Sequence, residues 1–564
     1  MKTNIFKSAV LAVGLLGFIS CSDNFLNSDP ITDVTEDNFY LNEKDFNRAL
    51  VGCYDALRTI WDDGVAFPIA SEIMSDDCFG GTGKGDGKAY KMLNNFNILT
   101  DAGNVNQFNN TWISYYKAIY RYNKLLSKLD KASVDTVARK RIEGETRFLR
   151  AYTYFDMVRL WGNIPLKLEP TDANEPQAKA DDVYKVIASD LKFAADKMNS
   201  ESWSGSWATD NDGHATSWAA KSLLARVFLF YTGYYNKETL PSNDGVITKQ
   251  QVLAGLEDVI TNGGFSLVPE YKNLWLSTSY KTLKKGGKSG QDILAPGTYA
   301  GEGNSEIVFA IKYNNTAYWD KNIGSNKWLV QIGVRGENAG YPYGQGWGGA
   351  TVNPKLVEAF GTDPRKDLSI ISVEKELPGT GIFKLAKHIE DMQDYTGYMN
   401  KKYTPLSNPD GTSYAAYVCP NTNTSFMICQ FQDYFSIRYA DVLLMAAELG
   451  SASAQDYFNQ VRNRAYYPKT APIRTVNKEN IMKERMLEFA FEGFRYWDLL
   501  RQGIETAATT IEQAENGVEV KTAGQKEVLS VSAASIRATE GLQQIPNTQI
   551  TLSNNLLKQN KGWE

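Results

Sequence analysis

The chain has 564 residues, a formal net charge of −5 and no cluster of basic residues, so its composition argues against nucleic-acid binding. It contains only two histidines, His214 and His388, and no Cys-x-x-Cys motif, so histidine catalysis, a zinc ribbon and a thioredoxin-type site all lack support. We expect no metal and no cofactor. The unusual component is aromatic: Trp, Tyr and Phe make up 12 % of the residues.

Residues 1–20 have the features of a secretory signal peptide. Lys2 and Lys7 give a positively charged start, and the apolar run that follows is shorter than the ~20 residues of a membrane-spanning helix. The sequence Phe18-Ile19-Ser20-Cys21 resembles a bacterial lipobox, in which the cysteine thiol takes diacylglycerol and becomes the first residue of the mature protein. An ordinary secreted protein with a chance cysteine at this position is the alternative. Stable anchoring needs more than one acyl chain.

Residues 21–40 are polar and carry only acidic charges, which predicts an acidic tether. Residues 41–262 then show repeated helical periodicity. The expected helices cover residues 46–57, 112–126, 148–158, 181–198 and 216–235, and the third should end at Gly162 and Pro165. Such consecutive amphipathic helices predict stacked pairs of the TPR kind, although no clean 34-residue period is visible. The expected fold class is mostly α: a degenerate TPR-like scaffold with long irregular loops and short-strand insertions.

The helical pattern breaks over residues 263–435. Fifteen of the 45 glycines lie between Gly286 and Gly361, with tryptophans in or beside the same stretch, which indicates long loops with short strands. Helices resume at 438–450, 453–465 and 478–502, and a polar tail follows from about residue 504. We expect residues 436–564 to be C-terminal helices and a closing tail of the same body. Sequence cannot pair Cys53, Cys78, Cys419 and Cys429.

Four motifs resemble catalytic or binding motifs, but the residues around each of them do not fit that function. Gly287-Lys288-Ser289 lacks the earlier glycine of a P-loop, and residues 344–349 (GQGWGG) match G-x-G-x-x-G without a preceding strand or a following helix. Glu484, Glu488 and Glu492 recur on one expected helix, but neighbouring arginines favour ion pairs over a glycosidase pair. Residues 210–213 (DNDG) lack the distal Glu of a calcium loop and read as a turn.

The many Trp and Tyr residues of the insertion predict a binding surface. A planar Trp or Tyr can stack on the apolar C–H face of a sugar ring while remaining partly exposed, and amides, carboxylates and arginines beside it can bond the hydroxyl groups. For any single ring, core packing is the commoner role. As a group in a Gly-rich insertion, they favour a surface platform: Trp275, Tyr280, Tyr299, Trp319, Trp328, Tyr341, Tyr343 and Trp347, among polar neighbours that include Gln331 and Arg335.

Six blocks of the chain resemble the SusD/RagB family, in family order. They are residues 147–155 (RFLRAYTYF) with 160–166 (LWGNIPL), 219–229 (AAKSLLARVFL), 437–448 (IRYADVLLMAAE), 459–465 (NQVRNRA), 484–499 (ERMLEFAFEGFRYWDL), and Ile545-Pro546 with Gln559-Asn560 and Gly562-Trp563. The sequence differs from the residues that are commoner in this family at three positions, Phe494, Gln549 and Lys561. These differences do not disturb the pattern.

The resemblance implies an outer-membrane lipoprotein of the Bacteroidetes type that faces the cell exterior. Such a protein would capture an oligosaccharide and pass it to a TonB-dependent, SusC-like transporter, with no enzymatic chemistry. By position, the family's ligand site would also take residues from the loop after the first helices, including Asp77 and Tyr90 (with Asp76, Phe79 and Lys84 nearby). Asp23 resembles the surface-export signal of such lipoproteins. The predicted ligand-binding set is therefore Asp77, Tyr90, Trp275, Tyr299, Trp319, Trp328, Tyr343 and Trp347.

Two alternatives to glycan capture stay open at this stage. A surface glycoside hydrolase would need two carboxylates about 5–10 Å apart in a cleft. A RagB-like lid for peptide uptake would keep the transport role, and an acidic or apolar cleft without an exposed tryptophan would favour it.

Overall fold

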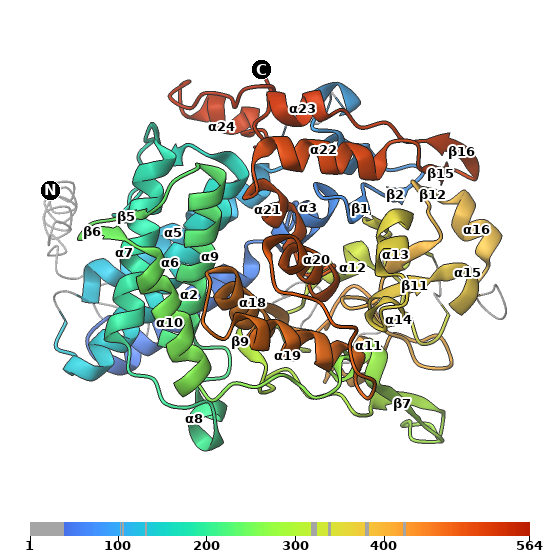
Figure 1. The fold of residues 1–564 in the computed structure, drawn as a ribbon, viewed down its shortest axis with the longest axis horizontal. Helices are drawn as coiled ribbons and strands as arrows, with labels where there is room; N and C mark the ends of the chain where they lie inside the picture. Colours follow the sequence, from blue (N-terminus) through green and yellow to red (C-terminus); the bar gives the residue numbers. More distant parts are fainter. Residues whose placement is uncertain are drawn as a thin grey trace, which may run out of the picture.

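The computed structural model describes residues 39–101, 103, 106–129, 132–316, 324–336, 340–377, 383–420 and 425–564 (Figure 1). The expected signal peptide, Cys21 and all but the last two residues of the expected tether lie outside these residues. Within them, no helix combines the length and the apolar character needed to span a bilayer. The prediction of a mostly helical chain with short strands is confirmed.

The helices of the first half form a sequential array in which each packs on the next (Figure 1). The third helix shows why its boundaries fall where they do: the Asp135 carboxylate accepts the backbone N–H of Val137 at 2.8 Å, and Gly162, at φ 66°, ends the helix. The members of the array are α2 (Glu43–Thr59), α5 (Asn109–Leu129), α6 (Thr136–Trp161), α7 (Ala180–Lys197), α9 (Ser217–Tyr234) and α10 (Lys249–Asn262).

The array continues across a large gap in the sequence. Helix α10 packs on α18 (Tyr439–Glu448), which in turn packs on α19 (Ala454–Tyr466) and α20 (Lys478–Glu488). Residues 263–438 are therefore inserted between two neighbouring helices. Shorter helices fill the rest: α3 (Phe67–Ile73), α4 (Ala89–Asn95), η2 (Ile98–Asp101), α8 (Gly205–Asp210), η3 (Tyr271–Leu274), α11 (Leu276–Ser279), α12 (Lys327–Ile332), α13 (Pro354–Phe360), α14 (Arg365–Ser369), α15 (Val373–Glu376), α16 (Leu385–Glu390) and α17 (Tyr414–Val418).

Short antiparallel strands tie the insertion to the first third of the chain. A four-stranded sheet has the order β1-β10-β13-β11, with Cys78 opposite Val352 and Ile371 opposite Met399. Strand β2 pairs with β12, which places Gly83 opposite Met392. These strands are β1 (Cys78–Phe79), β2 (Thr82–Gly83), β10 (Thr351–Val352), β11 (Ile370–Ser372), β12 (Met392–Gln393) and β13 (Tyr398–Asn400).

The remaining strands form two-stranded ribbons, all antiparallel. One ribbon, β9 with β14, leads directly into α18. The ribbons are β3 (Ile164–Pro165) with β4 (Gln177–Ala178), β5 (Leu240–Ser242) with β6 (Gly245–Ile247), β7 (Tyr280–Leu283) with β8 (Ile293–Pro296), β9 (Ile307–Ile311) with β14 (Tyr434–Arg438), and β15 (Glu519–Thr522) with β16 (Gln525–Val528).

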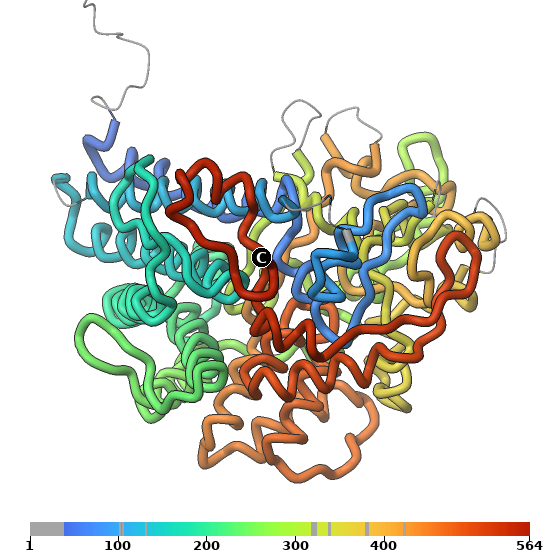
Figure 2. Tube along the Cα trace, turned by 90° about the horizontal axis from the view of Figure 1, so that it is seen from above, coloured from blue at the N-terminus to red at the C-terminus, as the bar shows by residue number. Residues whose placement is uncertain are grey.

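The C-terminal region differs from the sequence-based expectation in two ways. The single helix expected over 478–502 is wrong: α20 ends at Glu488 and α21 (Arg495–Leu500) begins after a turn in which Phe491 and Gly493 adopt φ 66° and 78°. The tail is also structured, with α22 (Ile504–Glu515), α23 (Ala533–Ala538) and α24 (Asn547–Leu552). It crosses from the helical array to the insertion, where β15 packs on β12 (Figure 2).

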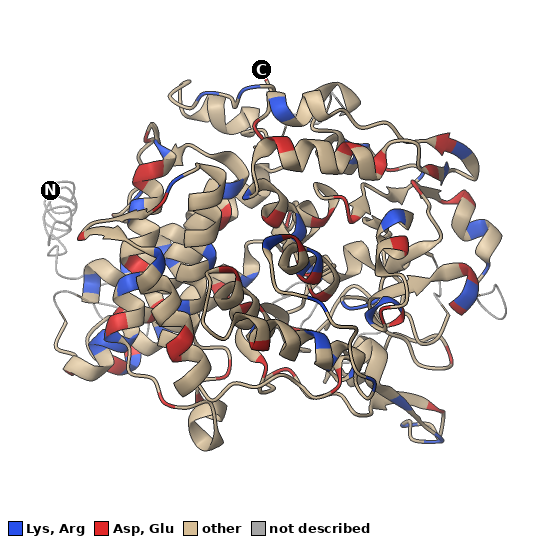
Figure 3. Ribbon diagram, in the orientation of Figure 1, with Lys and Arg blue, Asp and Glu red and all other residues tan. Residues whose placement is uncertain are grey.

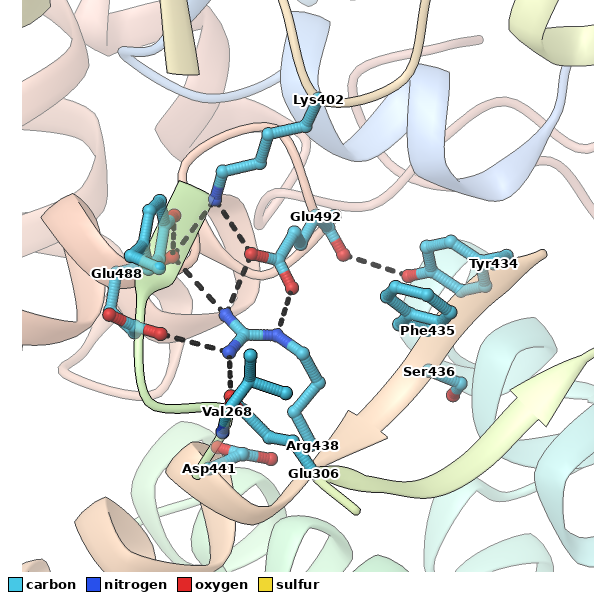
Figure 4. Close-up of polar contacts among 12 residues, drawn as sticks. Val268, Glu306, Lys402, Tyr434, Phe435, Ser436, Arg438, Asp441, Glu488 and Glu492 are labelled. Carbon is cyan, nitrogen blue, oxygen red and sulfur yellow. Dashed lines mark hydrogen bonds and ion pairs between the residues drawn. The ribbon is translucent and has the colours of Figure 1, made fainter. Parts of the chain in front are cut away.

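Helix α20 and the turn after it place Glu484, Glu488 and Glu492 in a buried group of charges that we call the central charge cluster. Arg438 contacts Glu492 at 2.7 Å and Glu488 at 2.8 Å (Figure 4). Lys402 also contacts Glu492 at 2.7 Å. Five cations face five carboxylates in the cluster: Arg365, Lys402, Arg438, Arg462 and Arg464 with Glu306, Asp363, Glu484, Glu488 and Glu492.

The members of the central charge cluster come from both sides of the insertion boundary. Glu306 and Lys402 belong to the insertion, whereas Arg464 and Glu488 belong to the last helices of the array. Elsewhere, Lys and Arg are interspersed with Asp and Glu in the view of Figure 3. Burial alone would raise the pKa of Glu488, but the guanidinium groups of Arg464, Arg438 and Arg365 lower it to about 2.

We predict that Glu488→Gln lowers the free energy of unfolding at pH 7 by about 3–5 kcal/mol, because it leaves buried cations short of a partner. Since the folded-state pKa of Glu488 is depressed below its ordinary 4.5, this contribution is present above pH 4.5 and is lost as the pH falls towards 2. Denaturant unfolding of both proteins between pH 7 and pH 3 measures the difference. Glu505→Gln, at a solvent-exposed ion pair with Arg537, is the matched control and should change little. Equal losses in the two variants would contradict the prediction.

Candidate functional site

The glycine-rich segment 344–349 lies against the end of α12 and presents one aromatic ring outward. The backbone N–H of Trp347 donates to the carbonyl of Val330 at 2.9 Å, and that of Gly346 donates to Val334 at 2.7 Å. A Cβ at Gly346 would lie 2.5 Å from the backbone of Gly333, so only glycine permits this close approach. The G-x-G-x-x-G match is thus explained by backbone packing. The Trp347 side chain remains 39 % exposed.

A second ring faces Trp347 from a loop far along the chain. Phe426 is half-buried, and its ring centroid lies 5.5 Å from that of Trp347 with 61° between the ring planes. A disulfide between Cys419 and Cys429 closes the loop that carries Phe426. The buried thiols of Cys53 and Cys78 stay free.

Arg335 completes this surface, and we call Trp347, Phe426 and Arg335 the Trp347 platform. The Arg335 guanidinium lies 5.9 Å from the Trp347 ring centroid, and its Nη1 donates to the Trp347 carbonyl at 3.2 Å and contacts Asp86 at 3.5 Å. A Cβ at Gly83 would lie 2.0 Å from Nη2, so the guanidinium rests on the Gly83 backbone. The Nε and Nη2 donors of Arg335 have no hydrogen-bond partner within the described residues.

His388 holds the backbone of Arg335 from beneath. Its Nδ1 lies 2.6 Å from the Arg335 carbonyl, and its ring lies between those of Phe383 and Tyr395. Burial lowers the pKa of His388 to about 4, with a smaller opposing effect from the hydrogen bond to the Arg335 carbonyl. The ring is therefore neutral near pH 7 and donates through Nδ1 to that carbonyl.

The turn at residues 83–86 is held rigidly beside the platform. The Asp86 carboxylate accepts the N–H of Gly83 at 2.8 Å, and the buried amide of Gln393 donates to the Gly83 carbonyl at 2.8 Å. Tyr90, which follows in α4, donates its hydroxyl to Gln331 of α12 at 3.2 Å. Tyr90 thus lies against α12, the helix on whose end the segment 344–349 packs. Tyr90 is half-buried, and burial raises its pKa to about 12.

The prediction of exposed contacts must be corrected for Asp77, Trp275, Trp328 and Tyr343, which are all buried. Trp275 is 0 % exposed and packs edge-on against Tyr403, and Trp328 is 1 % exposed and donates to the Tyr313 hydroxyl at 3.2 Å. These rings belong to the main hydrophobic core, which the insertion shares with the helical array. Tyr343 donates to Glu376, and Asp77 lies in the loop between α3 and β1, where burial raises its pKa.

The other predicted residues fall outside the Trp347 platform. Tyr299 is half-buried and donates to Glu302, and no contact joins it to Trp347. Trp319 lies outside the described residues. Phe426 and Asp86 were missed by sequence reasoning. The one signal for Phe426 was the Cys419–Cys429 spacing, which sequence alone could not pair.

Two protein-family models match the chain. The model described as "SusD family" matches residues 305–563, and the model described as "Starch-binding associating with outer membrane" matches residues 64–229. Among curated proteins, a "SusD-like protein" of Bacteroides ovatus is 24 % identical over 88 % of this chain and 82 % of its own length.

Solved structures resemble the whole described fold. A "Laminarin binding SusD-like protein" is 25 % identical, with a TM-score of 0.65, over 92 % of this chain and 99 % of its own. Surface glycan-binding protein A from Bacteroides thetaiotaomicron, solved in complex with laminarihexaose, is 21 % identical with a TM-score of 0.66 over the same shares. At that identity, the second likeness shows the fold alone.

We predict that His388 titrates near pH 4, well below its ordinary 6.5, because its ring is buried. The unfolded chain takes up this proton below pH 6.5, whereas the folded chain does so only at about pH 4. The free energy of unfolding therefore falls as the pH is lowered from 6.5 to 4. Carbon-13-labelled histidine gives two imidazole signals, which the His388→Gln variant assigns. His214, whose pKa is raised chiefly by its hydrogen bond to Glu145, is the internal control. Titration of the His388 signal near pH 6.5 would contradict the buried geometry.

Proposed function

We propose that the chain is a member of the SusD/RagB family, and that it is a surface lipoprotein that captures oligosaccharides and passes them to a TonB-dependent, SusC-like transporter. The family membership rests on the two matching models, which together cover residues from 64 to 563 with one gap. The laminarin-binding neighbour supports a glycan as the ligand class.

The Trp347 platform is the observation that carries the proposal. Trp347 is partly exposed and its ring contacts the half-buried ring of Phe426, so the two rings present a joint aromatic face. The two rings offer stacking faces for sugar C–H groups, and Arg335 offers two unused N–H donors for hydroxyl groups. Because the supporting backbone is held by hydrogen bonds on both sides, little ordering is needed on binding.

An exposed tryptophan disfavours the peptide-uptake alternative. Peptide capture would be better served by an acidic or apolar cleft, whereas the rim of the platform carries Lys84 with Asp391 and Arg335 with Asp86, each a pair of opposite charges. Such a rim offers both donors and acceptors to a neutral ligand that is rich in hydroxyl groups.

For the hydrolase alternative we considered the carboxylate pair of Glu302 and Asp433, in which Glu302 has a raised pKa. Burial raises the pKa of Glu302 to about 8, with the nearby Asp433 as the second cause, as a general acid would require. However, Asp433 is 1 % exposed, contacts Lys312 at 2.5 Å and accepts the N–H of Tyr313 at 2.7 Å. A buried carboxylate committed in this way is not available to attack a sugar or to activate a water, so we propose binding without chemistry.

The membrane anchor is proposed from the sequence. Cys21 would carry the lipid and residues 22–40 would form the tether, so that the folded body can move while remaining beside its transporter. The acidic charges of the tether would keep it away from an anionic membrane surface.

We predict that a gel containing laminarin, starch, another β-glucan, xyloglucan or pectin retards the purified protein, and that Trp347→Ala weakens the retarding interaction about tenfold, or about 1.4 kcal/mol. Affinity electrophoresis over a range of polysaccharide concentrations measures the change. Trp207→Ala removes a half-buried tryptophan of α8 and should leave the mobility shift unchanged.

Two results would reject this proposal. Retardation by none of the polysaccharides, or equal retardation of Trp347→Ala and the wild type, would remove the platform as the site. Release of reducing sugar that persists through rigorous purification would replace binding with hydrolysis.

We predict that Cys21→Ser releases the protein from the membrane fraction, because the serine hydroxyl cannot take the diacylglycerol. Cell fractionation and metabolic labelling with an alkyne fatty acid check the result. Ser22→Ala is the matched control and should remain labelled and membrane-bound. A labelled Cys21→Ser protein would place the anchor elsewhere.

A further inference from the structure

A cavity of about 510 Å³ opens on the helical array, between α5, the loop 165–175 and the C-terminal segment 549–557. We call it the α5 pocket. Figure 1 places α5 and α24 in the half of the molecule that carries the array, whereas β2 and β12, which flank the Trp347 platform, lie on the other side. The volume falls in the range of small-ligand sites. No residue of the α5 pocket belongs to the platform.

The three walls of the α5 pocket are hydrogen-bonded to one another in a closed ring. Tyr116 of α5 donates its hydroxyl to the Pro165 carbonyl at 3.0 Å. Asn174 of the loop donates to the Leu552 carbonyl at 3.0 Å, and Gln549 of α24 donates to Asn109 of α5 at 2.8 Å. The loop is fixed from inside as well, since Lys167 donates through Nζ to the Ala173 carbonyl at 2.7 Å. The pocket is therefore preformed, which lowers the ordering cost of binding.

The lining of the pocket combines exposed apolar groups with unused polar ones. Tyr120 is 36 % exposed and Leu552 is 63 % exposed at the mouth, and the half-buried Tyr116 lies on the same face of α5, four residues before Tyr120. The lining carries three carboxylates and three cations: Glu169, Asp172 and Glu175 with Lys117, Arg121 and Lys167. Within the described residues, the side chains of Glu169, Asp172, Glu175 and Lys117 form no ion pair.

This combination selects one ligand class. Because the three carboxylates are matched by three cations, the lining selects for neither an anion nor a cation, and its charged rim disfavours a lipid tail. An aromatic ring at the mouth with acceptors and donors around it suits a neutral polyhydroxylated ligand, whose ring offers C–H groups to Tyr120 and hydroxyl groups to the carboxylates. We infer that the α5 pocket is a second carbohydrate-binding site that takes a short neutral oligosaccharide. Two such sites on one chain raise the avidity for a polysaccharide that reaches both.

Saturation-transfer NMR on the purified protein tests the site with four probes: laminarihexaose, maltohexaose, cellohexaose and xylohexaose. We expect that Trp347→Ala retains a signal from at least one hexaose, and that adding Tyr120→Ala weakens this residual binding about tenfold. Tyr467→Ala, which removes another exposed tyrosine outside both sites, is the matched control and should change nothing. Glu175→Gln should weaken the same signal without removing the aromatic ring.

The outcomes separate this site from the Trp347 platform. The inference is overturned if no hexaose gives a signal that depends on Tyr120, in the wild type or in the Trp347→Ala background. A signal that depends on Tyr120 but not on Trp347 would keep the α5 pocket and reject the platform. Circular dichroism and the melting temperature of each variant show whether it is folded, and because Tyr120 is exposed we expect both to match the wild type.

Discussion

The central charge cluster is the constraint on which the rest of the structure depends. Ten ionised side chains lie out of water, and burying any one of them alone would cost several kcal/mol. The cost is offset because each cation meets a carboxylate: Arg438, for example, contacts Glu306, Glu488 and Glu492 together. A cluster of this kind tolerates one arrangement only, since a shift of any contributing segment would strand a charge. It therefore fixes how the inserted residues 263–438 sit on the array.

The two candidate sites use the resulting framework differently. The Trp347 platform is assembled from segments far apart in sequence, and each is secured by backbone contacts: the glycine-rich segment against α12, and the turn of Gly83 against β12. The α5 pocket belongs to the array itself and is closed by the C-terminal tail. At both sites, the exposed apolar side chains are attached to backbone that is ordered by packing and hydrogen bonds. Their exposure therefore does not imply a flexible backbone.

The helices were predictable because their burial is periodic, and α2, α5, α6, α7 and α9 lie where the pattern put them. The break after Glu488 was not predictable, because Phe491 adopts a positive φ, which is uncommon for a bulky residue. The tryptophans show the deeper limit. Trp275 and Trp347 look alike in sequence, but Trp275 is buried by Tyr403 and Phe435, more than a hundred residues away, whereas Trp347 is turned outward by the glycines around it. Composition predicted an aromatic surface, and only the long-range packing could say which rings form it.

The contact between α10 and α18 has a consequence for biogenesis. The chain is synthesised from its N-terminus, so α10 is complete before the insertion and before α18, the helix on which it packs. Glu488 and Glu492 are made later still, so Lys402, Arg438 and Arg464 lack these two partners until synthesis has passed α20. A chain truncated before α20 would therefore keep these buried cations without their carboxylates, which would destabilise the fold and expose the chain to proteolysis.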